Sequence, residues 1–243
     1  MKIAILADTH GNLTALNTVL VALENENLDQ MICLGDVASM GPQPHECLQK
    51  IQSLDIPIVL GNTDDWLIHP SSIPEDDTPV FNTMRWCAEQ MTEADQAFLR
   101  TFQDTIEVVL EGDLKLLCFH GSPTDFNDII MSTSPDEEFS KHFSGLDAKL
   151  VTGGHTHVQL LRRFEDKLYI NPGSVGLPCR YYPNLHGGLS LMGSAEYAVI
   201  TVENGRVSVD LRSIPLEVNH ILKAADDAGM PHVDWWKALW DNA

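Results

Sequence analysis

Basic residues are scarce in this chain of 243 residues: 15 lysines and arginines stand against 35 acidic residues, which gives a net charge of −20 at pH 7. A mean field of that sign repels polyanions and argues against a protein held on nucleic acid by neutralising its phosphates. The charge does not exclude a small anionic substrate, because bound metal dications can reverse the sign of charge at a cleft.

Cysteines and long apolar runs are also few. The five cysteines are scattered and include no Cys-x-x-Cys pair, which favours reduced, buried thiols in a reducing compartment. No stretch approaches the ~18 uninterrupted apolar residues of a membrane span. The apolar start over residues 1–7 meets Asp8 too soon to form a signal peptide. These absences predict a cytoplasmic protein that makes no use of a membrane.

Short apolar runs alternate with helical patterns in the first quarter of the chain. Residues 2–7, 31–34 and 56–60 are typical of buried strands. Leucines at helical spacing predict a helix over 13–26, and a second helix is expected over 44–54. This alternation favours parallel strands joined by right-handed crossovers.

The remaining chain changes character twice. Residues 69–80 hold three prolines and no periodicity, which predicts a loop that could act as a lid. Helices are expected over 81–90 and 93–102, the second capped by Thr92. Strand patterns then follow at 105–110, 114–119, 149–152, 157–163, 167–170, 196–202 and 206–213. Asn204-Gly205, between the last two strands, is typical of a type I′ hairpin.

The order of these elements predicts an α/β fold in a single domain over 1–243, because no repeat or linker interrupts the chain. The first half has a parallel pattern and the second half an antiparallel one. Two sheets packed face to face, with helices outside, would accommodate both patterns.

Five short clusters of polar residues follow strand patterns directly, and most contain a glycine that lets the backbone turn. They are Asp8-Thr9-His10, Gly35-Asp36, Gly61-Asn62-Thr63-Asp64, His120-Gly121 and Gly153-Gly154-His155-Thr156-His157. Each cluster taken alone is more typical of a helix cap, a turn or a hydrogen-bonded core histidine. Together, Asp, Asn and His offer the oxygen and imidazole ligands that suit Mn²⁺, Fe or Zn²⁺. Seven such ligands with one shared carboxylate would satisfy two adjacent ions.

This ordered set resembles the calcineurin-like metallophosphoesterase superfamily, and within it the small bacterial and archaeal branch of YfcE-type phosphodiesterases. The resemblance extends from Asp8 to Asn171-Pro172-Gly173-Ser174-Val175-Gly176 and the strands beyond. It implies a four-layer α/β/β/α sandwich in which two mixed sheets pack face to face and helices lie outside. It also implies that a first metal ion is held by Asp8, His10, Asp36 and His157. Asp36 would bridge to a second ion, whose other ligands would be Asn62, His120 and His155.

The chain departs from many relatives at one position. Their histidine after Gly-Asn is thought to protonate the leaving oxygen or to hold the scissile phosphate, and here Thr63 takes its place. Asp64, Asp65 and a metal-bound water remain as candidates for the general acid. Arg180 lies one residue later than the Pro-Arg step of relatives. Its guanidinium could clamp a phosphate or could form a surface ion pair in an acidic protein.

These features predict a metal-dependent phosphoesterase, a hydrolase that uses two divalent ions drawn from Mn, Fe, Ni and Zn, with Mn²⁺ expected to support activity in vitro. A hydroxide bridging the two ions would attack phosphorus in line, with Asp36 holding both ions. The substrate would be a small phosphorylated molecule, for example a nucleotide. Phosphodiesters are favoured over phosphomonoesters, because diesters and activated esters depend less on a general acid.

Three alternative functions compete with this hypothesis. A non-catalytic protein-binding scaffold on the same fold, as in the small retromer subunit, would be marked by lost ligands, and none is lost here. A nuclease or DNA-repair subunit conflicts with the charge and with the lack of basic strips, so stable nucleic-acid binding is not expected. A metallo-β-lactamase would need His-x-His-x-Asp-His, whereas Val158-Gln159-Leu160 follows His157.

Overall fold

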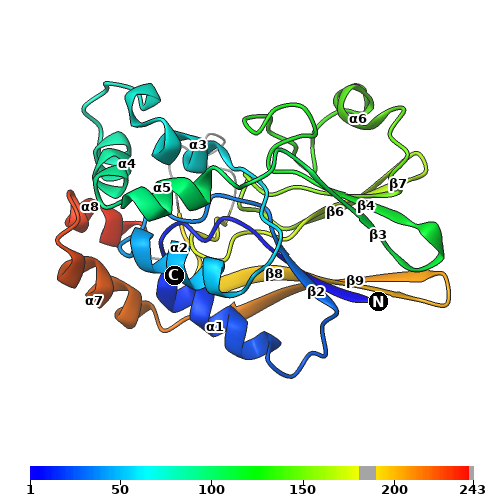
Figure 1. The fold of residues 1–243 in the computed structure, drawn as a ribbon, viewed down its shortest axis with the longest axis horizontal. Coiled ribbons are helices and arrows are strands. Elements are labelled where there is room, and N and C mark those ends of the chain that lie inside the picture. The colour runs from blue at the N-terminus through cyan, green and yellow to red at the C-terminus, as the bar shows by residue number, and fades with distance from the viewer. Residues whose placement is uncertain (181–189, 241–243) are drawn as a thin grey trace.

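The structure is a computed structural model that describes residues 1–180 and 190–240. Two β-sheets lie face to face at its centre (Figure 1). The first sheet has the order β2 (Gln30–Cys33), β1 (Lys2–Leu6), β8 (Ser194–Glu203) and β9 (Arg206–Pro215). The second has the order β3 (Ile106–Val109), β4 (Lys115–Cys118), β5 (Leu150–Thr152), β7 (Lys167–Asn171) and β6 (Leu160–Phe164). Both sheets are mixed: β1 runs parallel to β2 but antiparallel to β8, and the parallel strands β4, β5 and β7 lie between the antiparallel edges β3 and β6.

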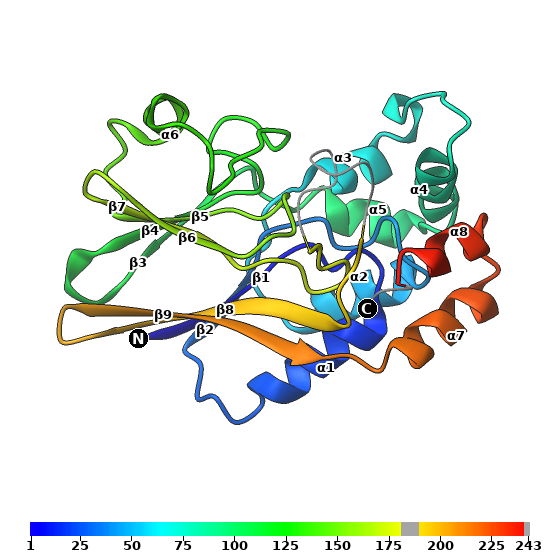
Figure 2. The same ribbon diagram turned by 180° about the vertical axis from the view of Figure 1, so that it is seen from behind.

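The helices occupy three places around the sheets (Figures 1 and 2). Helices α1 (Leu13–Leu23), α2 (Pro44–Ser53) and α7 (Val218–Ala228) lie on the side of the first sheet, and α6 (Asp136–Phe143) covers the second. At one end gather α3 (Asn62–Ile68), α4 (Pro79–Glu89), α5 (Glu93–Leu99) and α8 (Val233–Ala238). Two short 3₁₀ turns are η1 (Pro70–Ser72) and η2 (Glu111–Asp113).

Three apolar clusters correspond to the three interfaces of a four-layer sandwich. Successive residues of a strand face opposite sides, so Ala4 and Leu6 pack toward the helices while Ile3 and Ile5 pack between the sheets. On the far side of the second sheet, Tyr169 packs with the aromatic residues of α6. The expected α/β/β/α architecture is therefore confirmed.

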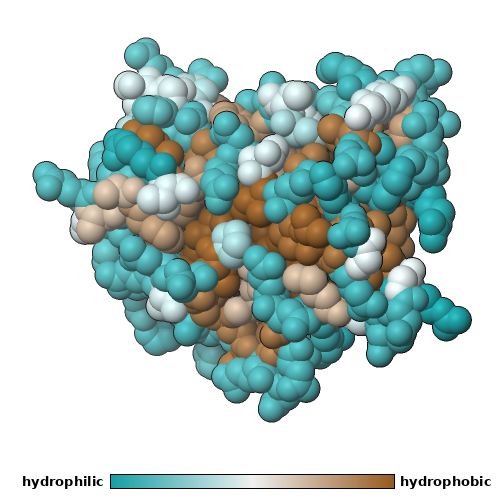
Figure 3. Space-filling model, turned by 45° about the vertical axis from the view of Figure 1, so that its right-hand side comes forward, coloured by the Kyte–Doolittle hydropathy of each residue, from teal (hydrophilic) through white to brown (hydrophobic). Residues whose placement is uncertain are grey.

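The apolar layer between the sheets is incompletely covered at its margins. Met1, Val108, Leu114, Val209 and Leu211 pack against this layer while staying partly exposed. From one side of the molecule, an apolar band is visible between two hydrophilic lobes (Figure 3). No helix within residues 1–180 and 190–240 combines the length and apolar character that a membrane crossing requires.

Several predicted elements are confirmed and one is wrong. The β8–β9 hairpin turns at Asn204 and Gly205, whose φ values of 51° and 71° fit a type I′ turn. Thr92 caps α5 through a reciprocal bond with Asp95. The strand expected over 56–60 does not form, because the segment makes two isolated bridges, from Ile58 to Cys33 and from Val59 to Gln103. Helices α3 and α6 were not predicted.

Candidate metal centre

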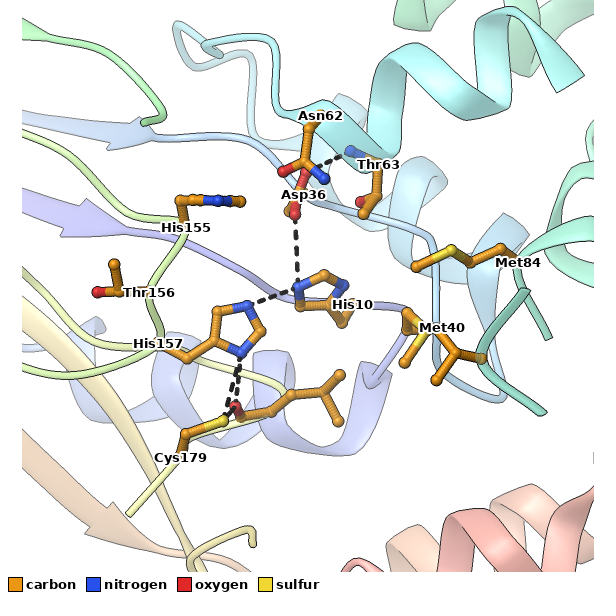
Figure 4. Close-up of a pocket in the computed structure, with 12 residues that line it drawn as sticks. His10, Asp36, Met40, Asn62, Thr63, Met84, His155, Thr156, His157 and Cys179 are labelled. Atoms are coloured by element: carbon orange, nitrogen blue, oxygen red, sulfur yellow. Dashed lines mark hydrogen bonds and ion pairs between the residues drawn. The ribbon is translucent and has the colours of Figure 1, made fainter. Parts of the chain in front are cut away.

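The seven predicted ligands converge beyond the carboxyl ends of the strands. Figure 4 shows five of them, namely His10, Asp36, Asn62, His155 and His157. Asp8 and His10 follow β1, and Asp36 follows β2. Parallel strands bring their carboxyl ends to the same edge of a sheet, which is where open α/β folds place ligands. The remaining four come from the start of α3, the end of β4 and the loop after β5: Asn62, His120, His155 and His157.

The first group of potential ligands consists of Asp8, His10, Asp36 and His157, whose donor atoms all lie within 4.8 Å of one another. His10 Nε2 lies 2.9 Å from His157 Nε2 and 3.6 Å from Asp36 Oδ2. His157 Nε2 lies 3.5 Å from Asp8 Oδ1. These separations place all four donors around one common point.

The second group consists of Asp36, His120 and His155, again with donor atoms within 4.8 Å. His120 Nε2 lies 3.4 Å from Asp36 Oδ2 and 3.1 Å from Asn62 Oδ1, which adds the amide oxygen to this group. Asp36 thus belongs to both groups. The geometry divides the seven residues in the way that the resemblance implies.

The donor chemistry fits a cation better than it fits an empty cluster. The Nδ1 atoms of His10 and His157 lie 3.0 and 2.8 Å from the carbonyl oxygens of Ser39 and Leu177, so each neutral ring donates its N–H there. Each neutral ring then turns an Nε2 lone pair toward the other across only 2.9 Å. Asp8 Oδ1 is buried without a hydrogen-bond partner among the described residues. A positive ion between these lone pairs would relieve both conflicts.

Burial and mutual charge shift the pKa values of the site. Burial raises the pKa of Asp8 well above its usual value, and it lowers the pKa of His10 and the pKa of His155, the latter to about 4. Burial opposes ionisation of both Asp36 and His120. The attraction between the negative carboxylate and the positive ring outweighs this effect of burial, so the pKa of Asp36 is lowered and the pKa of His120 is raised to about 9. His10 and His155 are therefore neutral at pH 7, which is the form that binds a metal ion.

The backbone around the ligands is held in an unusual conformation. Asp8, His10, Asp36, His155 and His157 all have φ between 47° and 66°. Non-glycine residues in this left-handed region are uncommon and cluster at functional sites, where the surrounding structure stabilises the strain. Position 61 must be glycine because its backbone lies against the Asp36 side chain, and a Cβ there would lie 2.1 Å from Asp36 Oδ1.

A second layer of hydrogen bonds braces the loops. The Ser174 hydroxyl donates to the carbonyl oxygen of Asp8 at 2.7 Å. The Asn171 amide donates to the carbonyl oxygen of Gly154 at 2.7 Å and to Thr156 Oγ1 at 3.0 Å. Sequence reasoning gave Ser174 and Asn171 no role, although their segment follows a strand and contains a proline and two glycines, as a bracing loop would.

The structure places Asp64 behind Asp36 rather than in the cavity beside the ligands. Its fully buried carboxylate accepts backbone N–H groups from Asp36, Val37 and Gly61 at 2.7, 2.9 and 3.1 Å. Burial, followed by repulsion from Asp36, raises the pKa of Asp64 to about 7. This geometry suits a residue that positions Asp36.

The other candidates around the ligands lie in different places. The Thr63 backbone N–H donates to Asp36 Oδ1 at 2.9 Å, and the residue lines the cavity beside the ligands. Asp65 is half-buried, lies 3.8 Å from the His69 ring, and is not among the residues that line this cavity. Arg180 is exposed and lies outside the lining as well.

A model of the calcineurin-like phosphoesterase superfamily domain matches residues 1–204. The chain belongs to this superfamily. The metallophosphoesterase from Sphaerobacter thermophilus is 25% identical in sequence, superposes with a TM-score of 0.73, and the match covers 98% of each chain. The hypothetical protein PH1004 from Pyrococcus horikoshii shares the fold with a TM-score of 0.82 at 18% identity, over 100% of this chain and 98% of its own.

A curated relative, the uncharacterized protein MJ0912 of Methanocaldococcus jannaschii, is 28% identical over 193 residues, which cover 72% of this chain and 76% of that protein. All seven ligand positions lie inside the part of the chain that the superfamily model matches. Membership in a superfamily of metal-dependent phosphoesterases agrees with the cation-binding chemistry of the cluster.

Proposed function

We propose that the chain hydrolyses phosphoesters with two divalent metal ions held by the seven ligands, and that phosphodiesters are its preferred class. The observation that carries this proposal is the presence of Asp36 in two adjacent ligand groups. Two ions bound there would supply a nucleophile at neutral pH and neutralise the charge on the phosphate. Mn²⁺ is the ion we expect to support activity in vitro, because mixed oxygen and imidazole donors suit it.

The residues of the chain prepare the site before any substrate arrives. Backbone carbonyl groups hold the rings of His10, His120 and His157 in place through their Nδ1 atoms. At His10 and His157, whose pKa values are lowered, such bonds fix the tautomer and leave Nε2 as a ligand. His120, whose pKa is raised, would give up its Nε2 proton when a metal ion binds. Asp64 fixes the backbone of Asp36 and Val37, so the shared carboxylate is positioned by the fold.

The cavity beside the ligands favours a diester for two reasons. Among its described lining residues there is no lysine or arginine, so none of these residues neutralises a second phosphate charge. The same lining offers no carboxyl group besides Asp36, and a threonine hydroxyl is too weak an acid to protonate a leaving alcohol at neutral pH. A phosphodiester carries a single negative charge, and one with a stable leaving group needs no general acid, so such an ester suits this cavity.

Hydrolysis of a matched pair of esters tests the proposal. Metal-depleted protein would be assayed with Mn²⁺, Ni²⁺ or Zn²⁺ against bis(p-nitrophenyl) phosphate and p-nitrophenyl phosphate, which release the same alcohol. We expect metal-dependent turnover, with the diester preferred by at least about tenfold in kcat/KM. Absence of turnover with every ion would contradict the phosphoesterase function and revive the scaffold alternative, which the complete ligand set does not favour.

A further inference from the structure

The cavity beside the metal ligands has two chemically different walls. It has a volume of about 250 Å³, and the ligands His10, Asp36, Asn62, His155 and His157 line one side. Apart from Thr63 and Thr156, the other lining side chains are apolar or weakly polar (Figure 4). We name this second set the apolar wall, and its members are Met40, Val80, Met84, Leu177 and Cys179.

The apolar wall is built from segments that the fold brings to the ligands. Val80 and Met84 are one helical turn apart on α4 and so share a face of that helix. Met40 lies in the loop after β2, four residues beyond Asp36. Leu177 joins the two walls, since its carbonyl oxygen receives the His157 Nδ1–H while its side chain lines the cavity.

Four of the five side chains in this wall have no counterpart in the chemistry at phosphorus, because thioether and aliphatic groups neither bind metal dications of this kind nor transfer protons. The fifth, Cys179, is buried and donates its thiol hydrogen to the carbonyl oxygen of Leu177 at 3.4 Å. Met40 and Met84 are 5% and 7% exposed, so each presents a small surface to the cavity and packs its remainder into the core. Apolar surface next to a metal centre is costly to hydrate, and an apolar group that covers it is stabilised.

We propose that the apolar wall binds the organic group of the phosphoester, and that this group is uncharged and apolar, of the size of an aryl ring. This inference rests on the proposed function, because it places the phosphate at the seven ligands. The absence of lysine and arginine from the described lining argues against a second anionic group. An aryl alcohol is also acidic enough to leave without a general acid, in agreement with Thr63 at the position of the family's histidine.

Phosphonates test the wall without turnover, because their carbon–phosphorus bond is not an ester. Binding of methylphosphonate and phenylphosphonate to the Mn²⁺-loaded protein would be measured by calorimetry. We expect phenylphosphonate to bind at least tenfold more tightly, which corresponds to about 1.4 kcal/mol. Equal affinities would overturn the inference.

Two nearly isosteric substitutions locate the effect on α4. In the double variant Val80→Thr, Met84→Gln, we expect the preference for phenylphosphonate to fall to about the level of methylphosphonate, whose own affinity should not change. Met131→Gln, at a half-buried methionine outside the cavity lining, is the matched control and should keep the preference. A double variant that retains the full preference would overturn the assignment of the wall.

The same preparations separate this inference from the proposed function. Hydrolysis of the diester with equal phosphonate affinities, or with no phosphonate binding, would remove the apolar-group inference and leave the phosphoesterase standing. Tight, Mn²⁺-dependent binding of phenylphosphonate in a protein that hydrolyses no ester would keep the apolar wall and overturn the proposed function.

Discussion

The two walls of the cavity are built by opposite means. The ligand wall consists of loops at strand ends, where five ligands have positive φ and the buried side chains of Ser174 and Asp64 brace the backbone. The apolar wall consists largely of side chains from α4 and two loops, which contribute shape to the cavity. The positions of the metal ligands are therefore fixed by the backbone, whereas the surface for the organic group can change by substitution on one helix.

The largest expected effect follows from removing the shared carboxylate. Asp36→Asn keeps the size of the side chain but removes its charge, so both metal positions should weaken together. We expect activity toward the diester to fall by several orders of magnitude while the circular dichroism spectrum stays native. Near-normal turnover in this variant, with activity abolished in Asn62→Ala, would show that Asp36 is not the bridging ligand.

A smaller loss should follow from disturbing the brace behind Asp36. In Asp64→Asn, an amide would replace a carboxylate that accepts three backbone N–H groups, and one of its donors would face those N–H groups. Substitutions behind metal ligands commonly cost 10- to 100-fold in affinity or activity, and we expect a loss of about this size in Mn²⁺ affinity. Asp65→Asn, at the next residue and outside the lining, is the control that should leave Mn²⁺ binding intact.

Glu196 separates stability from chemistry, because it lies behind the bracing segment and not in the cavity. The side chain is 6% exposed, its Oε2 has no hydrogen-bond partner among the described residues, and burial raises its pKa to about 8. A glutamate has a pKa of about 4.3 in the unfolded chain. Because the pKa of Glu196 is higher in the folded protein, its contribution to stability is fully present below about pH 4.3 and is lost as the pH rises through about 8.

Glu196→Gln carries no charge, so its melting temperature should exceed that of the wild type by several degrees at pH 8.5 and match it near pH 4. Thermal melts at both pH values would measure the difference, with Glu203→Gln at the exposed end of β8 as the control. A variant that is less stable than the wild type at pH 8.5 would contradict the account in which burial raises the pKa of Glu196.

The smallest expected effect concerns Thr63, which lies where the two walls meet. Its backbone N–H, not its hydroxyl, holds Asp36, and its Oγ1 has no partner among the described residues. Thr63→Ala keeps the backbone N–H and removes only a hydroxyl that makes no hydrogen bond to the described residues. The variant should therefore keep kcat/KM for an aryl diester within about threefold of the wild-type value. A loss of more than tenfold would show that the hydroxyl acts on the substrate.

The sequence predicted the fold class and the convergence of the strand-end residues, and it missed elements between them. Strand-end clusters carry their own signal, because glycines and polar residues interrupt apolar runs at fixed places. Helix α3, which begins at the predicted ligand Asn62, was missed because a helix of seven residues shows little periodicity. The signal for α6 was present in its acidic first turn and its Lys141-His142 end, which complement the helix dipole.

Other features depend on distances that no local pattern contains. The strand expected over 56–60 was wrong because the segment passes from the edge of β2 toward Gln103 and must then bring Gly61 against Asp36. The apolar wall could not be predicted, since Met84 reaches the ligands only through the packing of α4. Helical spacing identifies a buried face, but it does not say whether core or cavity lies opposite.

Crystals of the Mn²⁺-loaded protein would test the central claim most directly, through the anomalous scattering of the metal. We predict two anomalous peaks about 3.5–4 Å apart, one among Asp8, His10, Asp36 and His157 and the other among Asp36, Asn62, His120 and His155, with Asp36 contacting both. A single peak, two peaks that do not share Asp36, or no peak within this cluster would contradict the account of a dinuclear centre.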